Sequence, residues 1–433
     1  MRSPRCASSE PARPAATRPG EKGTVMDVTD DVLGPERLPR YFHAGTGAEL
    51  GVPPPADYRG QPVRTWARTL AGMQKEAVVL SGATGHVWRL VSDEGPYLAG
   101  HDRAPCPLAF MTTGMVASYM EELRTVARAR GITLHDVELV LDNRYTLEGS
   151  ALRGTGTMIG GALDPHVEAR VDSDATSDAV EEALAAAVAS SPVRGLVEDA
   201  LTSRFSLICN GEPVPVGRVG TVEALADATA LGPYEAARAA GPGDAQLVRM
   251  RTPADEVSGV PGAAGSSLQA DQSRTLHVRG TCTLEADGTK RVEQELFQPI
   301  GSAYTLWSDE AGSGEAEPSG SSEPTTSPRA PDAATYVAAG LAFCFMTQLG
   351  RYATIARKQL DAYQVVQDLQ LSPTAAPEHR GLAHPVETHV ALETPEGDEF
   401  ARTVLDTGER TCFLHALCRS KLTTRVTVDA PVR

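Results

Sequence analysis

Two cysteines in the second half of the chain are candidates for redox chemistry. Cys344 lies in an apolar stretch, Ala334–Met346, that predicts a buried helix, and Cys412 lies at the start of a second predicted helix. Thiols on two helices can meet in a folded protein, and such a pair reduces a peroxide when one sulfur attacks and the other resolves the oxidised product. Because the thiolate is the nucleophile, a nearby cation or helix N-terminus must lower the pKa of the attacking thiol. The residues therefore predict a dithiol site at Cys344 and Cys412.

Both cysteines also have a plain structural explanation. Cysteine is among the residue types most often buried, and an apolar helix commonly carries one in its core. The helix dipole favours a thiolate at Cys412, although ordinary helices also begin with cysteine. Cys106, Cys209 and Cys282 fall outside the paired positions and are expected to be structural. His415 shares a helix face with Cys412 and is expected to be a partly exposed histidine.

The order of predicted elements repeats along the chain, with serine in place of both cysteines in the first half. Ser118 lies in a long predicted helix, and Ser191 precedes a short one. The offset from Ser118 to Cys344 nearly equals the offset from Ser191 to Cys412. A repeat of this length is far longer than a solenoid repeat and indicates duplicated domains. No Ser/His/Asp pattern accompanies the serines, so the first half is expected to be inactive.

The elements themselves indicate an α+β fold. Alternating apolar residues predict strands, and apolar residues three and four positions apart predict helices. The expected strands are 76–82, 85–91, 136–141, 165–171, 205–209, 275–279, 291–297, 304–307, 364–371, 386–392 and 424–428, and the expected helices are 108–130, 176–189, 193–201, 334–358, 397–405 and 412–421.

Composition sets the domain boundaries. Residues rich in Ser, Gly, Glu and Pro cannot bury enough apolar surface to fold. Such an insert, at 308–331, precedes the helix of Cys344 and is expected to be disordered. The expected divisions are a disordered tail at 1–45, a first module at 46–213, a connector at 214–272 and a second module at 273–433.

Charge and hydropathy exclude several classes of protein. A net charge of −16 over 433 residues disfavours nucleic-acid binding and docking on an anionic membrane. The longest apolar run, Ala334–Met346, is shorter than the ~20 residues that span a bilayer. The N-terminus lacks the apolar core of a secretory signal, so a cytoplasmic location is expected. The seven cysteines have no framework spacing, and no zinc motif is present, so neither disulfides nor a metal are expected. The excess of arginine over lysine is typical of a GC-rich bacterial genome.

The residues around the paired positions resemble the OsmC/Ohr family of thiol peroxidases. That family has a long central helix with the first cysteine and a short helix that starts at the second, often as Cys-Pro-Val. Here Ala104–Leu108 resembles the lead-in to the central helix, and Ser191–Val193 resembles Cys-Pro-Val with serine for cysteine. In the second half, Leu341–Cys344 and Arg410–Cys412 match the two cysteine sites.

The resemblance, which covers roughly 70–210 and 273–430, implies a fold and an activity. Family members form intertwined homodimers, so the tandem chain would be a pseudo-dimer of two modules, each an antiparallel sheet on a long central helix. A further homodimer of this unit stays open. The implied reaction is reduction of organic hydroperoxides, with Cys344 attacking, Cys412 resolving and an external dithiol restoring both thiols. No cofactor is implied.

One family position is not matched in this chain. The family places a glutamate about nine or ten residues before the first cysteine, where it holds an arginine beside the thiolate. Thr335 and Ala334 occupy those positions here. Arg279 and Arg351 are the candidates for the activating arginine.

Two other functions remain open. One is an enzyme of the same fold repurposed for specialised metabolism, which the missing glutamate and the long insert favour. The other is a non-catalytic protein that holds a small apolar ligand between its halves. Thiols inert to alkylation and oxidation would remove the peroxidase interpretation. A reactive Cys344 without peroxide turnover would favour the repurposed enzyme.

Overall fold

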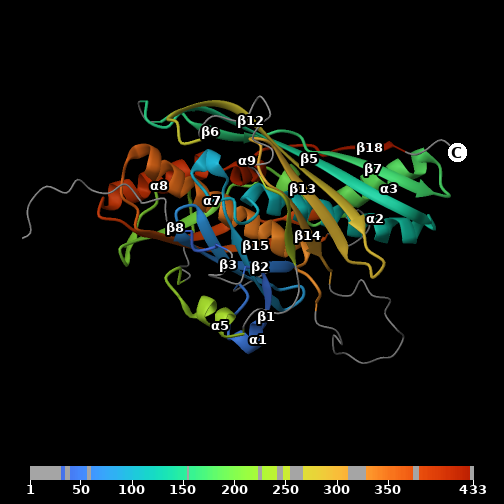
Figure 1. Cartoon of the computed structure of the whole chain (residues 1–433), viewed down its shortest axis with the longest axis horizontal. Coiled ribbons are helices and arrows are strands. Elements are labelled where there is room, and N and C mark those ends of the chain that lie inside the picture. The colour runs from blue at the N-terminus through green and yellow to red at the C-terminus, as the bar shows by residue number, and fades with distance from the viewer. Residues whose placement is uncertain are drawn as a thin grey trace, which may run out of the picture.

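Two long helices, α2 (Pro107–Arg130) and α7 (Ala333–Ala356), lie side by side between two β-sheets (Figure 1). The fold is α+β, and both sheets are largely antiparallel. The computed structural model describes residues 31–34, 40–55, 60–153, 156–222, 227–240, 247–253, 267–310, 328–373 and 380–429.

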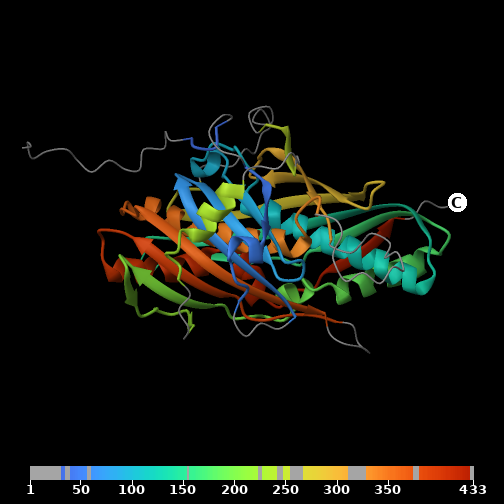
Figure 2. The same cartoon turned by 90° about the horizontal axis from the view of Figure 1, so that it is seen from below.

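The first sheet joins strands from both halves of the chain. Figure 2 shows early strands (blue) beside late strands (orange to red) in this sheet. Its order is β1 (Phe42–Thr46), β4 (His86–Ser92), β3 (Gln74–Ser81), β2 (Gln61–Ala71), β15 (Ala362–Pro373), β17 (Glu387–Glu393), β8 (Arg204–Cys209) and β10 (Gly220–Thr221), with β16 (Gly381–Ala383) beside β15 and β9 (Glu212–Val214) beside β8.

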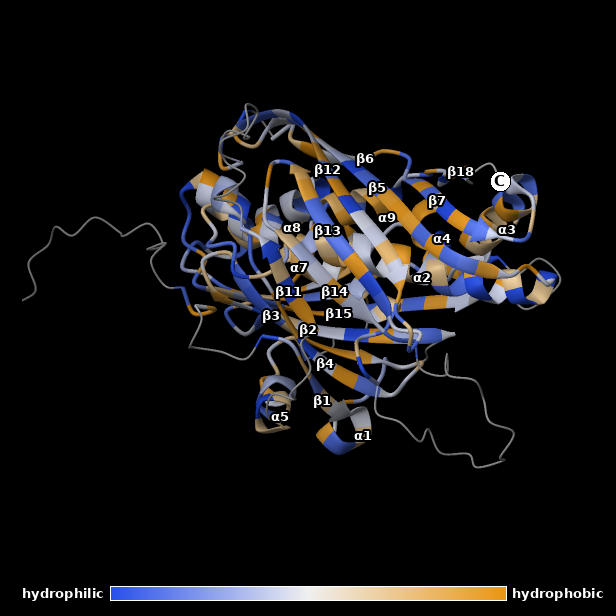
Figure 3. Ribbon diagram, turned by 45° about the vertical axis from the view of Figure 1, so that its right-hand side comes forward, coloured by the Kyte–Doolittle hydropathy of each residue, from blue (hydrophilic) through white to orange (hydrophobic). Residues whose placement is uncertain are grey.

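The second sheet is built the same way. Its strands alternate between hydrophilic and hydrophobic residues, as expected for a sheet with one face on the core (Figure 3). Its order is β11 (Val248–Thr252), β14 (Ala303–Ser308), β13 (Lys290–Gln298), β12 (Asp271–Leu284), β5 (Leu134–Ser150), β7 (His166–Ser173) and β18 (Arg425–Asp429), with β6 (Ile159–Ala162) beside β5.

Shorter helices complete the layers. The helices α8 and α9 pack on α7, and α3 packs on α2. Two further helices, α1 and α5, lie on the outer side of the first sheet (Figure 1). The bounds are α1 (Gly47–Leu50), α3 (Ser177–Ser190), α4 (Arg194–Glu198), α5 (Gly232–Ala240), α8 (Asp398–Thr411) and α9 (Phe413–Arg419), with a 3₁₀ turn at Pro96–Leu98.

Glycine allows α2 and α7 to cross closely. A Cβ atom on Gly114 would lie 2.6 Å from the carbonyl oxygen of Ala333, and one on Gly340 would lie 2.9 Å from the backbone nitrogen of Met111. No real Cβ tolerates such a distance to backbone. The crossing therefore requires glycine in both helices, and it fixes the helix faces that carry Ser118 and the first candidate thiol.

Among the helices of the described residues, α7 alone has the length and the apolar composition needed to cross a membrane. The most apolar window of this helix is 89% buried inside the protein. The buried core helix of a protein can have the same length and apolar composition as a membrane-spanning helix.

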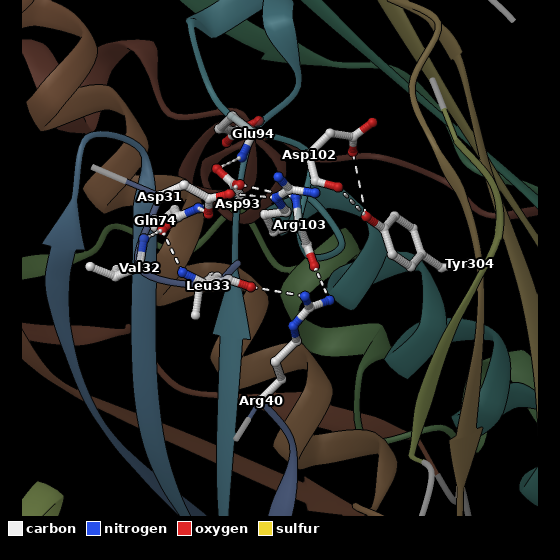
Figure 4. A network of polar contacts seen from close by, with 10 residues as sticks. All are labelled: Asp31, Val32, Leu33, Arg40, Gln74, Asp93, Glu94, Asp102, Arg103 and Tyr304. Atoms are coloured by element: carbon white, nitrogen blue, oxygen red, sulfur yellow. Dashed lines mark hydrogen bonds and ion pairs between the residues drawn. The ribbon is translucent and has the colours of Figure 1, made fainter. Parts of the chain in front are cut away.

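The tail predicted at 1–45 is ordered in part, which corrects that expectation. Leu33 is fully buried against Val91 and Ala104. The buried side-chain oxygen of Gln74 accepts the backbone N–H groups of Val32 and Leu33 (Figure 4). These contacts, together with strand β1, hold residues 31–34 and 40–45 on the fold, while 1–30 and 35–39 lie outside the described residues.

The insert and the connector also contain ordered residues. Ser308 ends β14, and Asp309 is buried and paired with Arg329, so the predicted disorder at 308–331 is wrong at both ends. Residues 311–327 lie outside the described part. The expected connector at 214–272 contains α5 and β11, and its residues 254–266 are likewise outside the described part.

Candidate functional site

The two predicted cysteines meet in the core. Cys344 lies in the middle of α7, and Cys412 is the N-cap residue of α9. Their Sγ atoms are 3.4 Å apart, and their side chains are only 2% and 0% exposed. Both are free thiols. The apolar surroundings of α7 and the packing of α9 on it bring two sulfurs that are distant in sequence into contact.

His415 is a third member of this cluster. Its Nδ1 atom lies 3.2 Å from Sγ of Cys412, and its backbone N–H donates to the same sulfur at 3.5 Å. The side chain is 1% exposed, between the rings of Phe205 and Phe345 at 5.5 and 5.2 Å. The predicted partial exposure of His415 is wrong, because α9 is buried on all sides from Phe413 to Cys418.

The surroundings push the pKa values of the two thiols apart. Burial raises the pKa of Cys344 well above its usual value, and the neighbouring Cys412 adds to this. Burial opposes ionisation of Cys412 as well, but hydrogen bonding to Cys344 and the charge and hydrogen bonds of His415 prevail and bring the pKa of Cys412 well below its usual value. The surroundings therefore favour ionisation of Cys412 over ionisation of Cys344.

A cavity of about 30 Å³ lies beside Cys344. Thr347, Gln348 and Arg351 follow Cys344 at three, four and seven positions along α7, so all four share one helix face and line this cavity. The apolar wall consists of Leu98, Leu108, Leu147, Leu276, Leu296 and Phe413. Since a water molecule needs about 10–15 Å³ by this measure, the cavity admits about two oxygen-sized atoms.

The candidate Arg351 lies in the cavity wall. Its Nε donates to the carbonyl oxygen of Ser267 at 2.8 Å, and its Nη1 donates to the side chain of Gln348 at 3.1 Å. Its Nη2 has no acceptor among the described residues. Burial lowers the pKa of Arg351 to about 10, which leaves the guanidinium charged at neutral pH.

The other candidate, Arg279, lies away from the thiols. It forms a two-pronged ion pair with Asp142 on the outer face of the second sheet, at 2.9 and 2.8 Å. Even-numbered residues of β12 such as Val278 and Cys282 point to the core, so odd-numbered Arg279 points outward. The arginine of β12 that lines the cavity is instead Arg274.

Glu94 is a cavity residue that sequence reasoning missed. Its carboxylate accepts hydrogen bonds from the hydroxyls of Thr347 at 2.8 Å and Tyr97 at 2.9 Å. Burial raises the pKa of Glu94, despite these bonds and the charge of Lys75. Glu94 follows β4 in the first half of the chain. One sequence signal marks it, because the tripeptide Ser-Asp-Glu occurs at 92–94 and again at 308–310.

Cys106, expected to be structural, lines the same cavity. It is the N-cap residue of α2, and burial raises its pKa to about 12. It is therefore a neutral thiol at physiological pH.

The first half has an equivalent meeting point. Oγ of Ser118 lies 2.8 Å from Oγ of Ser191, and both side chains are buried. Within the described residues, no group of three or more His, Cys, Asp or Glu side chains is placed to hold a metal ion.

Comparison with known proteins gives little assistance. No family model and no curated protein matches the chain. Among solved structures it is similar to an OsmC-like hydroperoxide resistance protein from Jannaschia sp. CCS1, with 18% sequence identity and a TM-score of 0.18. The match covers 31% of this chain and 79% of that chain. A likeness of this extent is too slight to assign the chain to a family.

Proposed function

We propose that this chain is a thiol-dependent peroxidase that reduces organic hydroperoxides through Cys344 and Cys412. The observation that carries the proposal is the 3.4 Å separation of two buried, free sulfurs, one of which borders a cavity of peroxide size. A disulfide requires an S–S distance of about 2.05 Å, so the two sulfurs, now 3.4 Å apart, need to approach by about 1.35 Å.

The proposed reaction begins at Cys344, because this sulfur lines the cavity. The Cys344 thiolate attacks an oxygen of the hydroperoxide, so that an S–O bond forms as the O–O bond breaks. The alkoxide that leaves takes the proton held by Glu94. Arg351, which has an unpaired Nη2 atom among the described residues, holds the peroxide oxygen.

Cys412 completes the cycle in this proposal. Its sulfur attacks the Cys344 sulfenic acid, forming the disulfide, and the departing hydroxide takes the proton of Cys412 and leaves as water. An external dithiol then reduces the disulfide. No bound cofactor takes part.

We also propose that the chain arose by tandem duplication and is a pseudo-dimer of two OsmC-like modules. Six neighbouring strands correspond between the sheets, since the first contains the run β4-β3-β2-β15-β17-β8 and the second contains the run β14-β13-β12-β5-β7-β18. Both β17–β8 and β7–β18 pair in parallel. The repeated Ser-Asp-Glu tripeptide and the paired glycines of α2 and α7 support the same proposal.

The test is a count of free thiols and an intact mass before and after one equivalent of cumene hydroperoxide. The proposal expects the loss of two thiols and of two hydrogens, absent in Cys344→Ser and Cys412→Ser. Sulfenic acid trapped in Cys412→Ser after long exposure to excess peroxide, but not in Cys344→Ser, would identify Cys344 as the attacking sulfur. Its formation is expected to be slow, because the serine variant lacks the thiolate that takes the proton of Cys344. Unchanged thiols in the wild-type protein contradict the proposal.

The two other functions make different predictions for the same protein. A cavity of about 30 Å³ is far below the roughly 300 Å³ of ordinary ligand pockets, so an apolar ligand and the organic group of a hydroperoxide both require the cavity to open. A repurposed enzyme is favoured if Cys344 reacts with electrophiles while peroxide is not consumed.

A further inference from the structure

We propose that His415 is a catalytic base that generates the reactive thiolate by way of Cys412, so that no arginine is required for activation. This inference rests on the proposed function, since it assigns the group that activates the same dithiol. His415, Cys412 and Cys344 form a continuous line of contacts, from Nδ1 to Sγ at 3.2 Å and from Sγ to Sγ at 3.4 Å. A proton can pass along this line without solvent.

The ring of His415 is fixed for this task. It is 99% buried, and Phe205 and Phe345 flank it. Its Nε2 atom has no partner within the described residues. The backbone of His415 is anchored to Cys412 as well, through the N–H bond to Sγ. Among the described residues, the Nδ1 atom has one hydrogen-bonding contact, which is with the sulfur of Cys412.

Three other titratable groups of the region, Tyr145, Cys418 and Glu94, do not serve as this base. Burial keeps the pKa of Tyr145 on β5 well above the usual value, and the nearby cysteines add to this, so Tyr145 stays neutral. Cys418 on α9 is neutral for the same reason, with a pKa raised to about 12. Glu94 lines the cavity beside Cys344, and because burial raises its pKa it serves the proposed reaction as the acid rather than as this base. Only His415 lowers the pKa of Cys412 by both charge and hydrogen bonding.

The two arginines considered for activation, Arg351 and Arg279, donate hydrogen bonds to other groups. Nε and Nη1 of Arg351 donate to Ser267 and Gln348, and Arg279 is paired with Asp142 across the second sheet. Neither of these two arginines is therefore held by a glutamate beside the thiolate.

The proton balance of the proposed step is complete. His415 takes the proton of the Cys412 thiol, which leaves a thiolate–imidazolium pair. As Cys344 attacks the hydroperoxide, its S–H proton passes to the Cys412 thiolate. The S–O bond forms, the O–O bond breaks, and Glu94 supplies the proton of the alcohol. Cys412, now a thiol, is ready to attack the sulfenic acid.

The test is a titration of thiolate by its ultraviolet absorbance in the absence of peroxide. Subtracting the absorbance curve of Cys412→Ser from that of the wild-type protein gives the titration curve of the Cys344–Cys412 pair. We expect its midpoint below the ordinary cysteine pKa of about 8.5. His415→Phe keeps the ring packing and removes the base, and His415→Gln keeps a polar side chain. Both are expected to raise the midpoint and to lower the thiolate content at pH 7 about tenfold or more.

Two control variants show whether a shift of the thiolate midpoint is specific to His415. His389→Gln removes another buried histidine, one hydrogen-bonded to Ser206 at 2.8 Å, and is expected to leave the midpoint unchanged. Arg351→Met is expected to leave it unchanged too. A midpoint that is insensitive to both His415 substitutions, or that rises in Arg351→Met, overturns the inference.

The same titration separates this inference from the proposed function. A His415-dependent thiolate in a protein that does not consume peroxide supports the inference and contradicts the peroxidase. Peroxide turnover with a thiolate midpoint that is independent of His415 supports the peroxidase and overturns the inference.

Discussion

Cys344 and Cys412 face different environments although their sulfur atoms are in contact. Cys344 faces the cavity and the carboxyl group of Glu94, while Cys412 faces His415. Two thiols in such contact share one negative charge and titrate as a pair, so the sulfur that meets peroxide need not be the one that carries the charge at rest. This division keeps a neutral thiol at the cavity until a substrate arrives.

Glu94→Gln tests the proton donor at the residue scale. Glutamine can still accept the hydrogen bond of Thr347, but it has no proton to give, so peroxide-dependent thiol loss is expected to slow about 100-fold. Burial raises the pKa of Glu94, so the wild-type rate should fall as the pH rises through that raised value, and this limb should be absent in the variant. Stopped-flow measurement of the rate against pH checks both.

The matched control for this prediction is Glu310→Gln. Glu310 holds the equivalent place in the second Ser-Asp-Glu tripeptide, where it accepts the N–H of Ala333 at 2.9 Å, so its replacement should leave the peroxide reaction unchanged. Identical pH profiles for Glu94→Gln and wild type would show that Glu94 does not donate the proton.

At the scale of elements, the close crossing of α2 and α7 positions the site. Gly114 and Gly340 let each helix approach the backbone of the other, and Cys344 follows Gly340 by one turn. A side chain at the crossing would push α7 outward and separate Cys344 from α9. The geometry of the sulfurs therefore depends on residues that never touch them.

Gly114→Ala tests this dependence. The added methyl group would meet the carbonyl of Ala333 and the backbone nitrogen of Val337, which cannot move without shifting α7. We expect a loss of about 2 kcal/mol in the free energy of unfolding, since overpacking outweighs the helix propensity of alanine. Urea denaturation measures it.

Gly232→Ala is the comparison, because a Cβ atom there has no neighbour within 4 Å. This variant is expected to stay within about 0.5 kcal/mol of wild type. Equal stabilities for the two variants would mean that the crossing relaxes at no cost.

The sequence was sufficient to predict the helices and strands whose apolar residues recur at regular spacing. The long helices and β3, β4, β7, β8 and β13 lie where their apolar patterns predict them. The strand β2 was missed because both of its faces are covered near Trp66, which removes the alternation. The outward direction of Arg279 depends on strand parity, and the burial of His415 and Glu94 depends on tertiary packing. The contact of Cys344 with Cys412 was suggested by the place of each thiol on a predicted helix and by the resemblance to the OsmC/Ohr family.

At the scale of the whole molecule, the two halves share every layer. In the second sheet, β12 pairs with β5 from Asp271 opposite Ser150 to Thr283 opposite Glu138. In the first sheet, β2 pairs with β15. The hydrophobic core around α2 and α7 is continuous across both halves. Neither half has a complete sheet without the other.

Separate expression of fragments 1–253 and 267–433 tests this sharing. Neither fragment is expected to be a folded monomer, because β2 and β5 in one lose β15 and β12 in the other. Mixing the fragments from denaturant should give a one-to-one complex with a native circular dichroism spectrum. A single fragment that elutes as a monomer and unfolds cooperatively would contradict the shared architecture.

The pairing of β2 with β15 has a consequence for synthesis of the protein. Thr69 contacts Tyr363, 294 residues later. At ribosomal rates of about 5–20 residues per second, β2 waits roughly 15–60 s for its neighbour, with an open edge that other nascent chains can pair with. Once β15 emerges, however, it is tethered to β2, so assembly is a first-order process. The yield of correctly paired sheets should therefore not depend on finding a second subunit, even when few copies of the protein are present in the cell.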